Sequence, residues 1–156
     1  MIRIIEIFDP ELKETISRDI LFDLPLWFGR PEDTEEYCIG VKDKTFFAAK
    51  EDDKFNGFIS LHDHTEYTSE MYVVGVLNSY RNKGIGTLLL KSAVERLLEN
   101  DKLYLTVKTL ADTHKSKEYK ETREFYLAKG FVPLEVFPDL WGADTPCLFM
   151  VKNLNK

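Results

Sequence analysis

The feature that most constrains this fold is a hydrophobic strand that runs through a glycine-containing loop directly into an amphipathic helix. The strand is predicted over Met71–Leu77 and the helix over Gly86–Asn100. Another strand is predicted over Leu103–Val107, so residues 70–109 form a β-α-β unit. A unit of this kind needs a sheet with helices packed on it, and it therefore predicts a mixed α/β fold.

Further strands and helices are predicted on both sides of this unit. Before it come a strand over Ile2–Phe8, a helix beginning at Pro10, an acidic helix over Glu32–Val41, and strands over Thr45–Lys50 and Gly57–Leu61. After it come a helix over Glu118–Lys129 and strands over Phe131–Phe137 and Cys147–Lys152. The expected order is β-α-α-β-β-β-α-β-α-β-β. No repeat or linker divides the sequence, which predicts a single domain over 1–156.

Charge is unevenly divided along the chain. Residues 1–69 carry 8 Lys and Arg against 16 Asp and Glu, whereas residues 70–156 carry 13 against 11. The net charges of −8 and +2 leave two interpretations open: acidic loops that aid solubility, or two halves that face ligands of opposite sign. The overall charge of −6 argues against a nucleic-acid partner, because nucleic-acid binders need a basic face.

Other classes of protein are disfavoured by composition. No apolar run approaches the roughly 18 residues of a membrane span, and charges stand where a signal peptide would be apolar. We therefore expect a cytoplasmic protein with no membrane partner. Cys38 and Cys147 are too few for a disulfide framework, and with three histidines they make a poor metal set. We expect both thiols to be buried and no metal to be bound.

The loop before the long helix has the chemistry of a phosphate site. Glycines leave backbone N–H groups open, and the helix N-terminus adds unpaired N–H groups and a positive dipole end. Arg81 and Lys83 add charge at its rim. A Walker loop and a dinucleotide fingerprint are excluded, because Thr87 and Leu89 stand where those motifs need Lys and Gly. From the loop alone, a phosphate site and a closely packed helix start remain equally open.

Two motifs in the second half resemble those of the GNAT superfamily of N-acetyltransferases. Arg81–Gly86 matches the Gln/Arg-x-x-Gly-x-Gly/Ala loop that binds the acetyl-CoA pyrophosphate, and Thr122–Phe131 resembles a later helix that ends Phe-Tyr-x-x-x-Gly-Phe. The resemblance covers 70–152 clearly, and over 1–69 it depends on element order. It implies a mostly antiparallel sheet, splayed between the fourth and fifth strands, with 70–152 as the acetyl-CoA-binding half and 1–69 as the acceptor side.

The resemblance also implies acetyl-CoA as co-substrate and direct transfer of its acetyl group to an amine. A strand N–H group, for which Val74 is the candidate, would polarise the thioester carbonyl as in an oxyanion hole. The expected acetyl-CoA-binding residues are Val74, Val76, Arg81, Asn82, Lys83, Gly84, Ile85, Gly86 and Thr87.

Tyr126 is the implied general acid, placed to protonate the departing CoA thiolate and acting as much as a hydrogen-bond donor as an acid. The alternative is a core aromatic residue, since Phe125 and Phe131 flank the same helix end. One departure from the family pattern is Tyr119, which replaces an asparagine that often lies seven residues before the tyrosine. A polar contact from that position to the cofactor is therefore in doubt.

Glu70 is the first candidate for the base that takes the proton of the acceptor amine. It lies eleven residues before Arg81, the spacing of the general-base glutamate in histone-type members, although an exposed strand-entry carboxylate is equally open. Strand alternation predicts four side chains on one face of the sheet: Glu70, Tyr72, Val74 and Val76. His62 and His64 are reserve bases, and His114 is expected to face solvent.

The acceptor is expected over the N-terminal half, bounded by Leu24–Tyr37 and by the loop near Trp141. There Trp27, Phe28 and Trp141 would form an apolar or cation–π wall unless they belong to the core. Acidic residues in this half favour a small cationic acceptor such as a polyamine, an aminoglycoside-like amine or a basic peptide terminus: Glu32–Glu36, Asp52, Asp53, Asp63 and Glu66. The predicted function is an N-acetyltransferase for a primary amine. The alternatives are a non-catalytic acyl-CoA-binding sensor or partner module and, less favoured, a nucleotide-binding domain. The resemblance also allows a homodimer.

Overall fold

A seven-stranded sheet runs through the computed structural model, which describes residues 1–112 and 115–155. The strands are β1 (Arg3–Glu6), β2 (Thr45–Glu51), β3 (Lys54–Asp63), β4 (Thr68–Val76), β5 (Tyr104–Leu110), β6 (Phe131–Phe137) and β7 (Cys147–Asn153). The helices are α1 (Pro10–Leu21), α2 (Pro31–Gly40), α3 (Ile85–Glu99) and α4 (Lys117–Ala128). The predicted order of these elements is confirmed. Two short 3₁₀ turns, η1 (Val41–Asp43) and η2 (Asn78–Tyr80), were not predicted.

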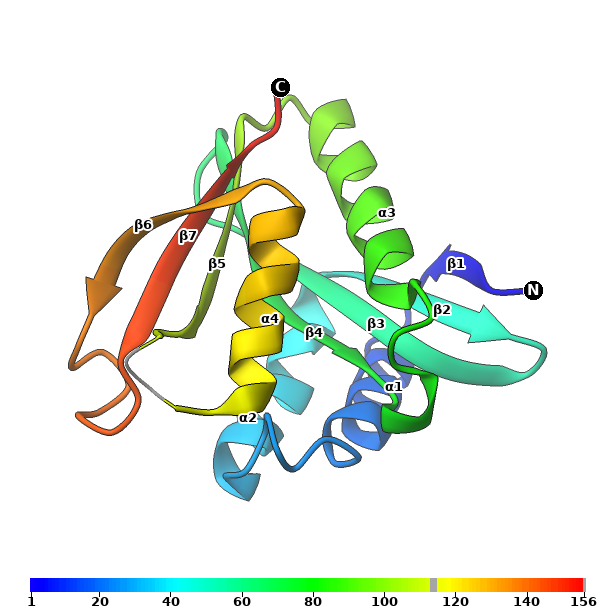
Figure 1. Ribbon diagram of the computed structural model, residues 1–156. Coiled ribbons are helices and arrows are strands. Elements are labelled where there is room, and N and C mark those ends of the chain that lie inside the picture. Colours follow the sequence, from blue (N-terminus) through cyan, green and yellow to red (C-terminus); the bar gives the residue numbers. More distant parts are fainter. Residues whose placement is uncertain (113–114, 156) are drawn as a thin grey trace.

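The sheet separates two hydrophobic cores. Its strand order is β1-β2-β3-β4-β5-β7-β6, and every neighbouring pair is antiparallel except β4 and β5. Helices α1 and α2 cover one face, while α3 and α4 lie on the other (Figure 1). The mostly antiparallel mixed sheet expected from the sequence is therefore confirmed.

Apolar spacing explains how the helices dock on these faces. In α1, Ile16 and Ile20 are buried and Leu12 packs against the same core, as their fourfold spacing predicts. The apolar spacing in α3 predicts one buried side made of Leu89, Leu90, Ala93, Val94, Leu97 and Leu98, and all of these pack against the core except Leu98, which is 43% exposed. Among the described residues, no helix is long and apolar enough to cross a membrane.

The parallel pair β4–β5 opens soon after it begins. Pairing runs from Thr68 with Tyr104 to Glu70 with Thr106, and no described residue pairs the two strands beyond that point. Both strands continue, β4 to Val76 and β5 to Leu110, so the inner edge of each has no strand partner there. This confirms the predicted splay between the fourth and fifth strands (Figure 1).

Tyr72 forms a β-bulge in β4, because the residues on either side of it pair with consecutive residues of β3. Val74 and Val76 pack against the core beneath α3 and α4, whereas Tyr72 packs against the core beneath α1 and α2. The prediction that these three residues share one face with Glu70 is therefore wrong. The bulge inserts one extra residue, and this shifts the alternation of side chains along the strand.

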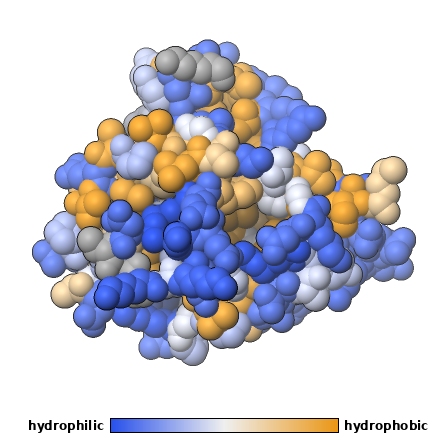
Figure 2. Space-filling model, in the orientation of Figure 1, coloured by the Kyte–Doolittle hydropathy of each residue, from blue (hydrophilic) through white to orange (hydrophobic). Residues whose placement is uncertain are grey.

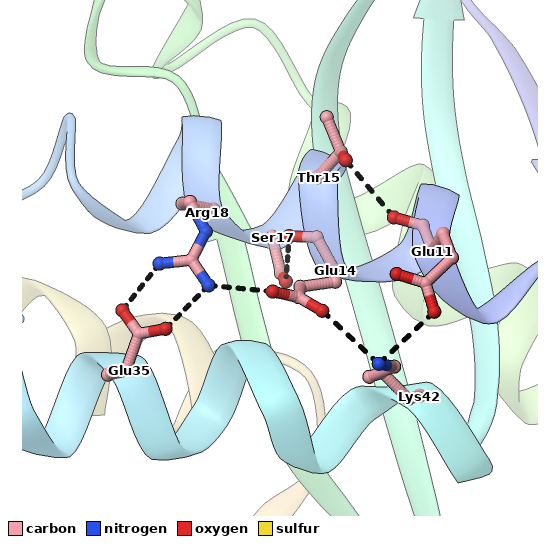
Figure 3. Close-up of polar contacts among 7 residues, drawn as sticks. All are labelled: Glu11, Glu14, Thr15, Ser17, Arg18, Glu35 and Lys42. Carbon is pink, nitrogen blue, oxygen red and sulfur yellow. Dashed lines mark hydrogen bonds and ion pairs between the residues drawn. The ribbon is translucent and has the colours of Figure 1, made fainter.

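Charged side chains fasten α1 to the segment that follows it. The Arg18 guanidinium pairs with the carboxylates of Glu14 and Glu35, and Lys42 Nζ lies 3.2 Å from Glu11 Oε1 and 3.4 Å from Glu14 Oε1 (Figure 3). Hydrogen bonds from Arg18 lower the pKa of both Glu14 and Glu35. Some of the excess acidic residues of the N-terminal half therefore form ion pairs within the protein.

Candidate active site

An open cleft of about 600 Å³ begins where β4 and β5 separate. It is lined by both strands, by the loop before α3, by α4, and by residues from Leu24 to Phe28. Figure 2 shows the molecule hollowed near the centre of the view, with a hydrophobic floor between hydrophilic rims. The splay of the sheet thus creates a channel that connects the start of α3 with the side of α4.

The loop before α3 presents unpaired backbone donors to this cleft. Gly84 is the N-cap of α3 at φ +81°, Asn82 has φ +62°, and no side chain caps the helix. No described residue accepts a hydrogen bond from the N–H groups of residues 82–87. These donors and the positive end of the helix dipole form an anion-binding cradle that fits a pyrophosphate.

Most of the predicted acetyl-CoA-binding residues line the cleft. They are Val74, Val76, Arg81, Asn82, Gly84, Ile85, Gly86 and Thr87. Lys83 lies outside the lining, and its ammonium sits 5.1 Å from the centre of the Tyr80 ring. The structure therefore brings the loop and the free edge of β4 together, and leaves Lys83 at the exposed rim.

Arg81 is held at one end of the cleft by two neighbours. Its guanidinium lies 4.1 Å from the centre of the Trp27 ring, and its Nη2 lies 3.9 Å from Glu121 Oε2 on α4. The Trp27 indole N–H in turn donates to Thr122 Oγ1 at 3.2 Å and to the Glu118 carbonyl at 3.3 Å. The aromatic ring and α4 thus orient a charged group next to the N–H cradle.

Tyr119 stands where the family often has asparagine, and here its hydroxyl joins two elements of the protein. The hydroxyl donates to the Trp27 carbonyl at 2.5 Å, which ties α4 to the segment after α1. Burial raises the pKa of Tyr119 to about 12, so its phenol stays neutral and keeps this donor. Tyr119 also lines the cleft, but its hydroxyl proton is already donated to the Trp27 carbonyl.

Tyr126 lines the cleft from α4 and is only 5% exposed. Its ring centre lies 5.8 Å from that of Phe125 and 5.4 Å from that of Phe131, so it packs as a core residue and also borders the site. Burial raises the pKa of Tyr126 well above its usual value. Its hydroxyl, which has no hydrogen-bond partner among the described residues, therefore remains a neutral donor available to a ligand.

Glu70 is buried beside the cleft rather than in its lining. Its Oε1 lies 2.7 Å from His64 Nε2, and both of its carboxylate oxygens lie 3.4 Å from Lys108 Nζ. The His62 ring packs edge-to-face on His64 at 4.7 Å, and His114 lies outside the described residues. Of Glu70, His62, His64 and Lys108, only Lys108 borders the cleft, so Glu70 reaches the cleft through Lys108. Its role as the base stays a prediction.

Lys108 lines the cleft but was not among the candidates from the sequence, and Tyr37 was named only as the end of the segment expected to bound the acceptor. Lys108 had a signal, because it is a charged residue inside the otherwise uncharged strand that became β5. The Tyr37 ring lines the cleft and packs against Tyr72 of β4, a contact that the sequence did not indicate. The predicted wall residues Trp27, Phe28 and Trp141 do line the cleft.

The acidic residues expected to attract the acceptor lie elsewhere. None of those predicted in the N-terminal half is among the described lining residues, and the acids that line the cleft are Glu121 and Glu124 on α4. Cys38 and Cys147 are both buried, as predicted, and burial raises the pKa of each thiol. Within the described part of the chain, no group of three His, Cys, Asp or Glu side chains is arranged to hold a metal ion.

Solved structures of acetyltransferases share this fold over nearly the whole chain. A GNAT-family protein from Desulfovibrio desulfuricans is 20% identical, with a TM-score of 0.84 and coverage of 99% of both chains. An aminoglycoside 6'-acetyltransferase of type Ii is 23% identical, with a TM-score of 0.76 and 97% coverage of each. A GNAT acetyltransferase from Elizabethkingia anophelis with acetyl-CoA bound is 18% identical, with a TM-score of 0.73 and 97% coverage of each.

Sequence comparison identifies the family directly. A search among curated protein sequences finds no significant match. The sequence profile of the Acetyltransferase (GNAT) family, however, matches residues 3–131, which is most of the chain. Together with the shared fold, this match shows that the chain belongs to the GNAT family and is an acetyl-CoA-dependent acetyltransferase.

Proposed function

We propose that this chain moves an acetyl group from acetyl-CoA directly to a primary amine. The observation that carries the proposal is one continuous cleft that joins the uncapped start of α3 to Tyr126. Acetyl-CoA supplies an acetyl group activated as a thioester. The N–H groups of residues 82–87 and the Arg81 guanidinium would hold its pyrophosphate, and the unpaired edge of β4 would hold the pantetheine arm.

Two groups of the chain are placed to assist the transfer. The Val74 N–H is the proposed donor to the thioester oxygen, where negative charge develops as the amine attacks. Tyr126 is the proposed donor to the departing sulfur. Because its pKa is raised, full proton transfer to a thiolate of pKa about 8.5 is unfavourable, and we assign the hydroxyl chiefly as a hydrogen-bond donor.

The acceptor must lose a proton before it attacks. Keeping an alkylamine of pKa about 10.4 neutral at pH 7 costs about 4.6 kcal/mol. Glu70 is the proposed base, and its pairing with His64 and Lys108 means that it would act through a bridging group rather than by direct contact with an amine in the cleft.

The charge pattern of the cleft gives little support to a small cationic acceptor. A small cationic acceptor was expected because the N-terminal half is acidic, yet the acids of that half do not line the cleft in the described structure. That expectation stays a prediction, as do a homodimer and a cytoplasmic location.

A panel of amines tests the proposal, with release of the free CoA thiol as the readout. We expect thiol release that depends on both acetyl-CoA and an amine. Thermal-shift titration should show stabilisation by CoA and acetyl-CoA but not by ATP or NAD. Stabilisation by CoA without turnover of any amine would instead favour the acyl-CoA-binding module, and no response to CoA would contradict both functions.

A further inference from the structure

The side of the cleft that faces α2 is lined by aromatic rings. Tyr37 on α2 packs edge-to-face against Phe28 at 6.0 Å and against Tyr72 of the β4 bulge at 5.3 Å. All three rings border the cleft, as does Trp141 from the loop between β6 and β7. This aromatic wall, consisting of Phe28, Tyr37 and Tyr72, suits a flat apolar group.

The phenols in the aromatic wall carry no negative charge at neutral pH. Burial, followed by the nearby Tyr72 and Glu70, raises the pKa of Tyr37 to about 12, and burial also raises the pKa of Tyr72. An anionic group bound beside this wall would therefore meet neutral hydroxyls. Glu70 lies two residues before Tyr72 in β4, and its carboxylate is 3.4 Å from Lys108 Nζ, which places Lys108 next to the Tyr72 end of the wall.

Among the described residues of β4 and β5 that line the cleft, Lys108 is the charged one; Lys44, outside the lining, has its Nζ 4.4 Å from the centre of the Tyr72 ring. The other charged residues among the described lining are Arg81, Glu121 and Glu124, which belong to the loop before α3 and to α4. Arg81 and Glu121 also lie against each other. A ligand group that enters between β4 and β5 toward the aromatic wall therefore meets one formal charge from these two strands, the positive charge of Lys108.

The ammonium of Lys108 is oriented by Glu70 but not saturated by it. Both Nζ–oxygen distances are 3.4 Å, whereas a charge-assisted N–H···O bond is about 2.7–2.9 Å. The shorter contact of Glu70 is the 2.7 Å one to His64, and the Lys108 side chain is 33% exposed. Since an ammonium has three donors, Lys108 keeps donors for a ligand in the cleft.

We propose that the acceptor is an amine that carries both a carboxylate and an aromatic or similarly flat group, with Lys108 binding the carboxylate and the aromatic wall binding the ring. This inference rests on the proposed N-acetyltransferase function and specifies its substrate class. Glu70, which is also the proposed base and is paired with His64, holds the Lys108 ammonium at the edge of the cleft. A polycation is disfavoured at the same place, since it would bring further positive charge toward Lys108.

The test compares acceptors that differ in one group. Phenylalanine carries the amine, ring and carboxylate, phenylalanine amide lacks the negative charge, and spermidine is a polycation without a ring. Turnover is followed by release of the CoA thiol, and binding to the acetyl-CoA-saturated protein is followed by calorimetry. We expect kcat/KM for phenylalanine to exceed that for its amide by about tenfold or more, since a hydrogen bond to a charged group has roughly that effect.

Variants of Lys108 test whether the preference for phenylalanine over its amide depends on the contact between Lys108 and the carboxylate. Lys108→Gln should lower the ratio of kcat/KM for phenylalanine to that for its amide about tenfold, since any effect on the route from Glu70 is common to both acceptors, and Lys108→Arg should keep most of the preference. Lys91→Gln, at an exposed position on α3, is the matched control and should behave as wild type. Melting curves of each variant show that the protein remains folded.

The outcomes separate the two proposals. A preference for spermidine or for the amide, or a preference that Lys108→Gln leaves unchanged, overturns the inference while turnover of those amines upholds the N-acetyltransferase. Binding of phenylalanine that depends on Lys108, without acetylation of any amine, upholds the recognition by Lys108 and overturns the proposed function. Absence of phenylalanine binding overturns the inference whatever the turnover.

Discussion

Replacing Tyr126 with phenylalanine removes one hydroxyl from the cleft and keeps the ring. The ring contacts with Phe125 and Phe131, at 5.8 and 5.4 Å between centres, do not involve the hydroxyl. That hydroxyl has no hydrogen-bond partner among the described residues, so its removal breaks no bond within them. We therefore expect the free energy of unfolding to change by less than about 1 kcal/mol, the net contribution of one ordinary hydrogen bond.

The effect of Tyr126→Phe on catalysis should be much larger. Removing one preorganised hydrogen-bond donor to a developing negative charge costs about 10²–10³-fold, so kcat should fall by that factor, or about 2.7–4 kcal/mol of activation free energy. Because the raised pKa keeps the wild-type phenol protonated throughout the neutral range, the loss should be the same at pH 7 and pH 9. The affinity for acetyl-CoA should change little, because the hydroxyl is assigned to the departing sulfur.

Release of the CoA thiol measures kcat, and urea unfolding measures stability. Tyr67→Phe is the matched control, because Tyr67 is 53% exposed and lies outside the cleft lining. Full activity of Tyr126→Phe on a good acceptor would refute the assignment and leave Tyr126 as a core aromatic residue. A large loss of stability would instead refute the statement that the hydroxyl has no structural partner.

Three other changes test the loop, the helix pairing and the segment at the cleft entrance. Gly84→Val forces a β-branched residue to φ +81° at a cost of about 1–2 kcal/mol, and this variant should lose the thermal shift with acetyl-CoA. Gly84→Asn should keep the shift. Equal thermal shifts for the two variants would contradict the proposal that the loop binds the pyrophosphate. The pKa values of Glu14 and Glu35 are lowered in the folded protein, so their ionised forms stabilise the fold above about pH 4.5, and this stability is lost as the pH falls through the folded-state pKa values. Arg18→Met removes the cause of the lowered pKa values. Urea unfolding of this variant should therefore show a smaller loss of unfolding free energy between pH 5 and pH 3 than wild type. Trp27→Phe removes the indole donor to α4 and should lower the unfolding free energy by about 1 kcal/mol, and an unchanged urea midpoint would show that this bond contributes nothing.

The loop before α3 was predictable from the sequence because its chemistry is local. A strand that ends at Val76, a glycine at the helix start and an apolar helix face all lie within one continuous segment, and each leaves its own pattern. The left-handed conformation of Gly84 and the unpaired donors after it follow from that segment with little help from the rest of the fold. The splay of β4 from β5 was implied by the family resemblance, and the register confirms it.

The inner end of the cleft was not predictable in the same way, because it depends on a cross-strand register. The bulge at Tyr72 arises from pairing with β3, and the apolar run of Val73 and Val74 that follows gives no sign of it. As a result, simple alternation placed Glu70 on the same face as Val74. The structure instead has Glu70 buried beside the cleft, where its partners are His64 and Lys108.

The same distinction limits what the uneven charge can indicate about the acceptor. A net charge of −8 over 1–69 suggests attraction of a cation, but it contains no information on which acids already have partners within the fold. Two of the acids, Glu14 and Glu35, pair with Arg18, and Glu14 also pairs with Lys42 (Figure 3). Exposed pairs of this kind are partly neutralised and are screened by salt, so they act weakly at a distance. The charge that an acceptor meets at the aromatic wall is set by the positive side chain of Lys108, which comes from the other half of the chain.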